Sequence, residues 1–277
     1  SVTQEASRSI SETSDYEFVP MIPQTPTSKI KGLILPHHLL VENYIGELYQ
    51  QISSPNIKRI IIISPNHFLY GRSYIQSTDN ADFYDLYGVS PDLEFIKNLD
   101  KNTPLEIETT NFGKEHGIYN HLMYIAGYFP NAKVVPIIIK GKTPQKILDP
   151  LITEILKNYS ADTLIIMSVD FSHYTEEKIA LDNDNKILAW LSKIIPNKDT
   201  KKESVYKEAN SLAVRINKPT EDYPVGIDSP ESVYVFVELM RNLDATKFNF
   251  IRRTSSADLL KITDPKQNTS HIFATVE

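Results

Sequence analysis

The chain of 277 residues has no cysteine, only nine glycines and no long apolar run. Without cysteine it has no disulfide, no thiolate metal ligand and no nucleophilic thiol, so any metal or acid–base chemistry depends on His, Asp and Glu. The few glycines form neither a G-x-G-x-x-G pattern nor a P-loop, which disfavours nucleotide binding of the Rossmann type. The apolar runs, such as Ile60 to Ile63, have the length of strands and fall far short of the roughly 20 residues that cross a bilayer. This composition is typical of a soluble globular protein.

Blocks of basic residues are missing as well. The net charge is −6, and Lys and Arg never form a run longer than a pair, so we expect neither DNA nor RNA as a partner. A cysteine-free chain is compatible with oxidising and reducing compartments alike. The location therefore stays open between the cytoplasm and an extracytoplasmic compartment, the second if a signal or anchor upstream of Ser1 has been removed.

The chain divides into a polar leader and a patterned remainder. Residues 1–28 are rich in Ser and Thr and then in Pro, which predicts a flexible leader with extended backbone. Residues 29–277 are predicted to form a single α/β domain, because short β-branched runs alternate with helical patterns.

The predicted elements follow the order of βαβ units. We expect strands at 32–35, 59–64, 133–139 and 163–168, and helices at 41–51, 115–128 and 143–158. The C-terminal third predicts helices at 183–195, 202–216 and 230–242, and strands at 248–253 and 272–276 that extend the sheet antiparallel. Continuously apolar strands are buried on both faces of a sheet. The sequence therefore predicts a single-domain, three-layer αβα sandwich with a mostly parallel or mixed central sheet.

Most of the seven histidines lie just after a predicted strand or on one predicted helix. These six are His37, His38, His67, His116, His121 and His173. Residues that follow neighbouring parallel strands meet outside the carboxyl ends of the sheet. A single loop histidine is usually a surface or capping residue, but three at equivalent positions predict a joint site of His37, His67 and His173.

Two histidines and one carboxylate bind divalent first-row metals and leave coordination positions open for water, O₂ or substrate. Spacing alone does not choose among the candidate carboxylates, which are Glu115, Asp170, Asp228 and Asp258. A serine hydrolase is disfavoured, because the chain has no G-x-S-x-G elbow. The serines near the strand ends are expected as turn and capping residues: Ser64, Ser168 and Ser172.

The order of these motifs resembles the Memo family, called AmmeMemoRadiSam system protein B in bacteria. The motifs that carry the resemblance, over about 31–277, are Pro36-His37, Ser64-Pro65-Asn66-His67, Glu115-His116-Gly117 with His121, and Asp170-Phe171-Ser172-His173. That family is similar in fold to the class III extradiol dioxygenases, whose non-haem Fe(II) is held by two His and one carboxylate. The resemblance implies the same fold here.

The resemblance also implies roles for particular residues. His37 and His67 match metal ligands, and Asp258 stands where the animal relatives have a cysteine ligand after a Ser-Ser pair. His173 matches the acid–base residue of the dioxygenases. The residues expected beside it in the catalytic group are Glu115, His116 and Asp170. The residues expected to contact substrate or orient ligands are His38, His121 and Asp228.

These assignments predict a metal-dependent enzyme of non-haem-iron, dioxygenase-like architecture with redox or O₂ chemistry. Two alternatives stay open: a zinc-type hydrolase, in which the same ligands activate water, and a non-catalytic protein that binds a ligand or peptide on the same fold. Fe(II) is the expected metal, with Zn(II) and Mn(II) as alternatives, and the lack of a cysteine ligand disfavours copper. The expected partners are a small-molecule substrate and, by family association, a radical-SAM protein and an AMMECR-type protein.

Overall fold

The computed structural model describes residues 29–108, 112–217 and 222–277. Within these ranges the main sheet has nine strands. They are β1 (Gly32–Leu35), β2 (Arg59–Pro65), β3 (Ile75–Ser77), β4 (Ser90–Pro91), β5 (Leu105–Ile107), β6 (Lys133–Ile139), β7 (Thr163–Ser168), β10 (Phe248–Ser255) and β11 (Ser270–Val276). A separate hairpin pairs β8 (Arg215–Asn217) with β9 (Asp222–Pro224). The helices are α2 (Glu42–Ile52), α3 (Ala81–Tyr87), α4 (Leu93–Asn102), α5 (His116–Tyr128), α6 (Gln145–Lys157), α7 (Glu177–Ile194), α8 (Lys202–Leu212), α9 (Pro230–Asn242) and α10 (Ser256–Leu260).

The main sheet is mixed, with a parallel centre. Its strands lie in the order β10-β11-β1-β7-β2-β6-β3-β5, and β4 also pairs with β6. β1, β7, β2 and β6 are parallel neighbours. β11 is antiparallel to β1, and β10 is antiparallel to β11. The carboxyl ends of β1, β7 and β2 therefore lie side by side at one edge of the sheet.

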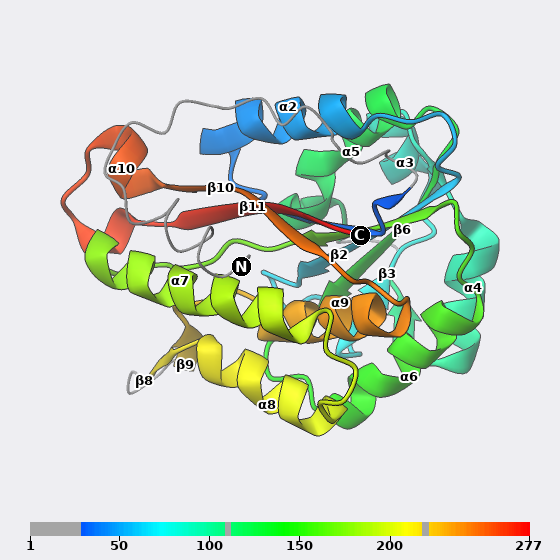
Figure 1. The fold of residues 1–277 in the computed structure, drawn as a ribbon. Coiled ribbons are helices and arrows are strands. Elements are labelled where there is room, and N and C mark those ends of the chain that lie inside the picture. The colour runs from blue at the N-terminus through cyan, green and yellow to red at the C-terminus, as the bar shows by residue number, and fades with distance from the viewer. Residues whose placement is uncertain (1–28, 109–111, 218–221) are drawn as a thin grey trace.

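The central strands send alternate side chains into two apolar cores. Leu33 of β1 and Ile60 of β2 belong to the core packed by α2, α3 and α5. Ile34 and Ile61, one residue further on, belong to the core packed by α4, α6, α7, α8 and α9. Figure 1 shows α2, α3 and α5 on one side of the sheet and α6, α7, α8 and α9 on the other. The predicted αβα sandwich is confirmed.

The long elements lie close to their predicted positions. β1, β6, β7 and α9 have the predicted bounds, and β11 extends the sheet antiparallel as expected. α7 begins at Glu177 rather than at residue 183, and α8 ends at Leu212 rather than at residue 216. The sequence predicts no element between the second strand and residue 114, where the structure has β3, α3, β4, α4 and β5.

The predicted leader, residues 1–28, lies outside the described residues, so the boundary at residue 29 stays a prediction. In the described part of the chain, no helix combines the length and the apolar character that crossing a bilayer requires.

Candidate metal centre

The candidate site lies where three neighbouring strands of the sheet end. His37 follows β1, His67 follows β2, and Asp170 follows β7, each by two residues. Because these strands lie in the order β1-β7-β2, their carboxyl ends bring the three residues to one crevice, as expected for an open α/β sheet. The start of α5 adds His116 to the same place.

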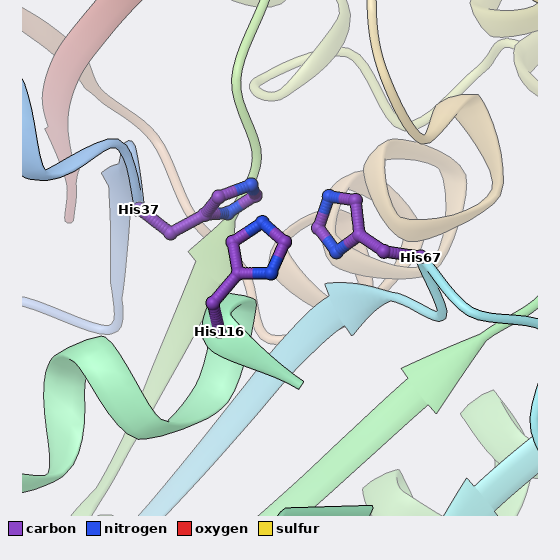
Figure 2. Close-up of side chains that lie close together, drawn as sticks. All are labelled: His37, His67 and His116. Carbon is purple, nitrogen blue, oxygen red and sulfur yellow. The ribbon is translucent and has the colours of Figure 1, made fainter. Parts of the chain in front are cut away.

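The rings of His37, His67 and His116 are turned towards one another (Figure 2). One ligand nitrogen of each ring lies within 4.8 Å of those of the other two. His37 stands edge-on to His67, with ring centroids 4.9 Å apart, and His67 stacks on His116 at 4.1 Å. His37 is buried, whereas the other two side chains are partly exposed. The cluster is therefore reachable from solvent.

Glu115 fixes the orientation of His67. The backbone N–H of His67 donates to Glu115 Oε2 at 2.9 Å, and its ring Nδ1 lies 2.5 Å from Oε1. Glu115 is fully buried, and as the N-cap of α5 it also accepts a hydrogen bond from the N–H of Gly117 at 3.0 Å. Because a carboxylate only accepts, Nδ1 of His67 carries a proton, and Nε2 is the nitrogen available to a metal.

A glycine lets α5 come close enough to β2 for this contact. A Cβ at Gly117 would collide with Ser64 Oγ and lie 3.0 Å from Ser64 Cβ at the end of β2. Only a residue without a side chain fits this close approach. The first turn of α5 therefore lies against the end of β2, which brings Glu115 and His116 beside His67.

Two carboxylates surround the other ligand nitrogen. Asp170 Oδ2 and Asp228 Oδ2 each lie 3.4 Å from His37 Nε2. The backbone N–H of His37 also donates to Asp170 Oδ1 at 3.2 Å. On the opposite side of the ring, Nδ1 lies 3.0 Å from Ser168 Oγ. His37 thus directs Nε2 to the acidic side of the site and Nδ1 into the protein.

Asp228 comes from the loop before α9 and carries the least satisfied carboxylate of the site. Its backbone N–H donates to the carbonyl of Asp170 at 3.1 Å. Gly226 packs so tightly that a Cβ there would lie 2.5 Å from a backbone oxygen of α8. Both Asp228 carboxylate oxygens are shielded from solvent and lack a hydrogen-bond partner among the described residues. Oδ2 also lies 3.7 Å from His67 Nε2. A buried charge without donors is costly, so this carboxylate depends on the two imidazole rings that it faces, or on a cation in the place of their protons.

The charged groups of the site shift the pKa values of their neighbours in the direction opposite to the shift caused by burial. Burial by itself would lower the pKa of both histidines, but Asp170 and Asp228 raise the pKa of His37 above its usual value. Asp228 and Glu115 raise the pKa of His67 to about 10. The same ion pairs hold the pKa of all three carboxyl groups below their usual values, although burial alone would raise them. In the metal-free protein, the three carboxylates therefore favour the protonated form of both rings.

His116 differs from its two neighbours. Burial lowers its pKa to about 4, and the positive charges of His67 and His37 add to this effect. The ring is consequently neutral near pH 7 and offers a lone pair to the cluster.

His173 follows β7 and has one ring nitrogen engaged. Its backbone N–H donates to Val225 O at 2.7 Å, and its ring Nδ1 lies 2.6 Å from Phe171 O. Because a carbonyl only accepts, Nδ1 carries the proton, and the neutral ring has its lone pair on Nε2. The ring is near enough to contribute to the low pKa of Asp170 and Asp228. The acid–base role of His173 stays a prediction.

His121 lies behind His37 in the core. It is fully buried, with Nδ1 2.9 Å from the hydroxyl of Tyr49 and Nε2 3.1 Å from Ser168 Oγ. Burial lowers its pKa to about 3, so the ring is neutral. His121 belongs to no group of metal-ligating side chains in the described part of the chain, and it cannot contact a substrate directly.

His38 turns away from the cluster towards a histidine that the sequence did not single out. Its Nδ1 lies 2.9 Å from Nε2 of His271, whose Nδ1 lies 3.0 Å from Thr254 Oγ1. His271 is fully buried near the start of β11. Because β11 is antiparallel to β1, its first residues lie at the same edge as the carboxyl ends of the parallel strands. This topology is the signal that would have identified His271.

Asp258 lies apart from the groups of metal-ligating side chains in the described ranges, and its assignment as a metal ligand stays a prediction. β11 separates β10 from β1, so β10 lies two strand spacings, about 10 Å, to the side of β1. The chain then enters α10, where the backbone N–H of Asp258 donates to Ser255 Oγ at 3.1 Å. The Asp258 carboxylate is 38% exposed and lies 3.8 Å from Lys261 Nζ. It belongs to neither of the metal-ligating groups found in the described ranges, which instead include Asp228 and Asp170.

Comparisons with known proteins agree with the architecture. The sequence profile of the family described as Memo-like protein matches residues 1–270. A MEMO1 family protein from Nitrosopumilus maritimus is 30% identical over 168 residues, which cover 57% of this chain and 59% of that protein. One from Aquifex aeolicus is 25% identical over 225 residues, 78% of this chain and 56% of that protein. The chain thus matches a little over half the length of these relatives.

A solved structure shares the fold. The crystal structure of uncharacterized protein JW3007 from Escherichia coli K12 superposes with a TM-score of 0.56 and 12% identity. The alignment covers 88% of this chain and 99% of that one. On the match of the family profile to nearly the whole chain, this protein belongs to the Memo-like protein family.

Proposed function

We propose that this protein is a metal-dependent enzyme of the non-haem-iron, dioxygenase-like type, with a divalent ion held by His37, His67 and Asp228. The observation that carries the proposal is the shielded Asp228 carboxylate, which lacks a hydrogen-bond partner among the described residues and faces both histidines. Asp228 would take the role that the family resemblance implies for Asp258.

The spacing of the donor atoms supports a first-row metal. Two ligands of a tetrahedral ion with bonds of ~2.1 Å are separated by about 3.4 Å. Asp228 Oδ2 lies 3.4 Å from His37 Nε2 and 3.7 Å from His67 Nε2. His116 adds a neutral nitrogen to the histidine group, so a further protein ligand is close by.

The charge balance of the pocket supports the same ion. Metal ligation requires neutral imidazole and ionised carboxylate, so binding releases protons. A divalent cation would take the place of the protons that Asp170, Asp228 and Glu115 favour on His37 and His67. The hydrogen bond from His67 to Glu115 is the kind of outer contact that fixes a metal-bound histidine.

The residues around the ion would have different roles in the reaction. A bound Fe(II) ion would supply redox chemistry with O₂ at the coordination positions that the protein leaves open. His173 would accept and return a proton through Nε2, because Phe171 O holds the proton on Nδ1. Asp170 would orient His37 through its contact with the backbone N–H.

The donor set also favours a second candidate, a zinc-dependent hydrolase. Imidazole and carboxylate ligands hold catalytic Zn(II), which lowers the pKa of bound water to about 7. The remaining partners rest on family resemblance alone: a small-molecule substrate, a radical-SAM protein and an AMMECR-type protein.

Metal titration of protein purified without oxygen and stripped with a chelator tests the proposal. We expect the wild type to bind about one Fe(II) or Zn(II) per chain, and His67→Ala to bind at least about tenfold more weakly while remaining folded. The metal that co-purifies separates the candidates, since iron supports the oxygenase and zinc the hydrolase. A folded wild-type protein that binds neither ion would contradict the proposal.

A further inference from the structure

Ser168, the last residue of β7, is a meeting point of three groups. Its Oγ donates to the carbonyl of Gly117 at 2.6 Å. The same oxygen lies 3.0 Å from Nδ1 of His37 and 3.1 Å from Nε2 of His121. Ser168 and His121 are fully buried and His37 is 2% exposed, so water does not compete for these contacts.

The number of hydrogens on each group determines which atom donates in each hydrogen bond around Ser168. A serine hydroxyl has one hydrogen and two lone pairs. The Gly117 carbonyl can only accept, so the hydrogen of Ser168 lies on that contact. Both imidazole nitrogens must then donate to Ser168 Oγ. Nε2 of His37 faces the carboxylates of Asp170 and Asp228, so a metal bound there would take the place of a proton on Nε2, and the neutral ring carries its proton on Nδ1.

The hydrogen bond between Tyr49 and His121 is consistent with this assignment. If His121 donates through Nε2, its Nδ1 must accept a hydrogen bond. The hydroxyl of Tyr49, 2.9 Å away and fully buried, is the donor that this nitrogen requires. All the polar atoms from Tyr49 to Gly117 are then paired, which is the condition for a stable buried network.

We propose that Ser168 is a positioning residue that holds His37 with Nε2 directed to the metal, and that His121 and Tyr49 support it from the core. The inference rests on the metal centre proposed above. Ser168 would act on His37 as Glu115 acts on His67, but through a neutral hydroxyl instead of a carboxylate. Of the two Nδ1 atoms, only that of His67 would then contact a carboxylate, because Nδ1 of His37 contacts a neutral hydroxyl.

Nitrogen NMR of the histidine rings tests the proton assignment without metal. The signals of His37 are identified by their loss in His37→Gln, and the pH is raised until this ring is neutral. We expect the wild type to carry the proton on Nδ1, and Ser168→Ala to give a mixture of both tautomers. A wild-type His37 with its proton on Nε2 would overturn the proposal, whether or not the protein binds metal.

Zinc affinity, measured by competition with a chromophoric chelator, tests the consequence. We expect Ser168→Ala to weaken binding by about 10- to 100-fold, as for other outer contacts of metal-bound histidine. Ser172→Ala is the matched control, since Ser172 is also fully buried and its hydroxyl donates to Asp184 Oδ1 at 2.8 Å, away from His37. Affinity within twofold of the wild type in Ser168→Ala would refute the positioning role. A wild type that binds no zinc or iron would instead refute the proposed metal centre.

Discussion

At the scale of single residues, the site depends on which atom each side chain leaves available. His67 has Nδ1 on Glu115, and His37 has Nδ1 on Ser168, so both rings turn Nε2 towards Asp228. Asp228 itself has no hydrogen-bond donor within the described ranges. Nε2 of each ring therefore lies beside the same oxygen of Asp228.

Exchanging the two candidate carboxylates for amides distinguishes their roles. We expect Asp228→Asn to weaken Fe(II) or Zn(II) binding by at least about tenfold, because it removes the charged ligand. Asp258→Asn is the matched control and should leave affinity unchanged, since its carboxylate lies beside Lys261 on α10. Equilibrium titration measures both. The reverse result, with loss only in Asp258→Asn, would restore the ligand implied by the family resemblance.

His271 predicts a pH dependence of stability. Burial lowers its pKa from 6.5 to about 3. The unfolded chain therefore binds a proton as the pH falls below about 6.5, whereas the folded protein does not bind one until near pH 3, so folding stability falls with pH. Relative to His271→Gln, the wild type should lose about 1.4 kcal/mol of unfolding free energy per pH unit between about pH 6 and pH 4.

Chemical denaturation in the presence of a chelator measures this difference. Above about pH 7 the two proteins should differ by a constant amount, because His271 is then neutral in both states. A difference that stays constant down to pH 4 would show that His271 is protonated in the folded protein.

At the scale of elements, the approach of α5 to β2 sets the geometry of the centre. The first turn of this helix supplies Glu115 and His116, and its distance from β2 depends on the missing side chain of Gly117. Gly127, near the other end of α5, has nothing within 4 Å of the position where a Cβ would lie. One helix thus contains a glycine required by packing and one that is not.

Alanine at these two positions should have opposite effects. Gly117→Ala would force α5 away from Ser64 and should destabilise the protein by about 1–3 kcal/mol. Gly127→Ala should stabilise it by up to about 1 kcal/mol, because alanine favours the helix and meets no neighbour. Thermal unfolding gives the stabilities. Equal effects of the two substitutions would contradict the close approach.

The length of an element decides how well the sequence predicts it. β2, β6 and β7 are long, continuously apolar runs, and their positions follow from pattern alone. β3, β4 and β5 have only two or three residues, too few for any period to be visible. β3 and β4 form because β6 offers them a partner, and β5 pairs with β3 in turn, which is information that a local pattern does not contain.

At the scale of the whole molecule, strand order decides which predicted residues meet. The βαβ pattern predicts parallel pairing of the strands. Parallel pairing in turn brings together His37, His67 and the segment after β7. The position of β11 between β1 and β10 has no local signal, and it is this strand that moves Asp258 away from the histidines. Asp228 has no strand end to mark it, since its loop reaches the site through contacts with Asp170 and α8. Its place beside His37 and His67, rather than that of another candidate carboxylate, is therefore visible only in three dimensions.

A crystal structure of the protein loaded with Fe(II) or Zn(II), with the ion located by anomalous scattering, tests the central claim most directly. We predict one ion within about 2.0–2.2 Å of His37 Nε2, His67 Nε2 and a carboxylate oxygen of Asp228. An ion bound elsewhere, or one coordinated by Asp258 and not by Asp228, would contradict the proposed centre.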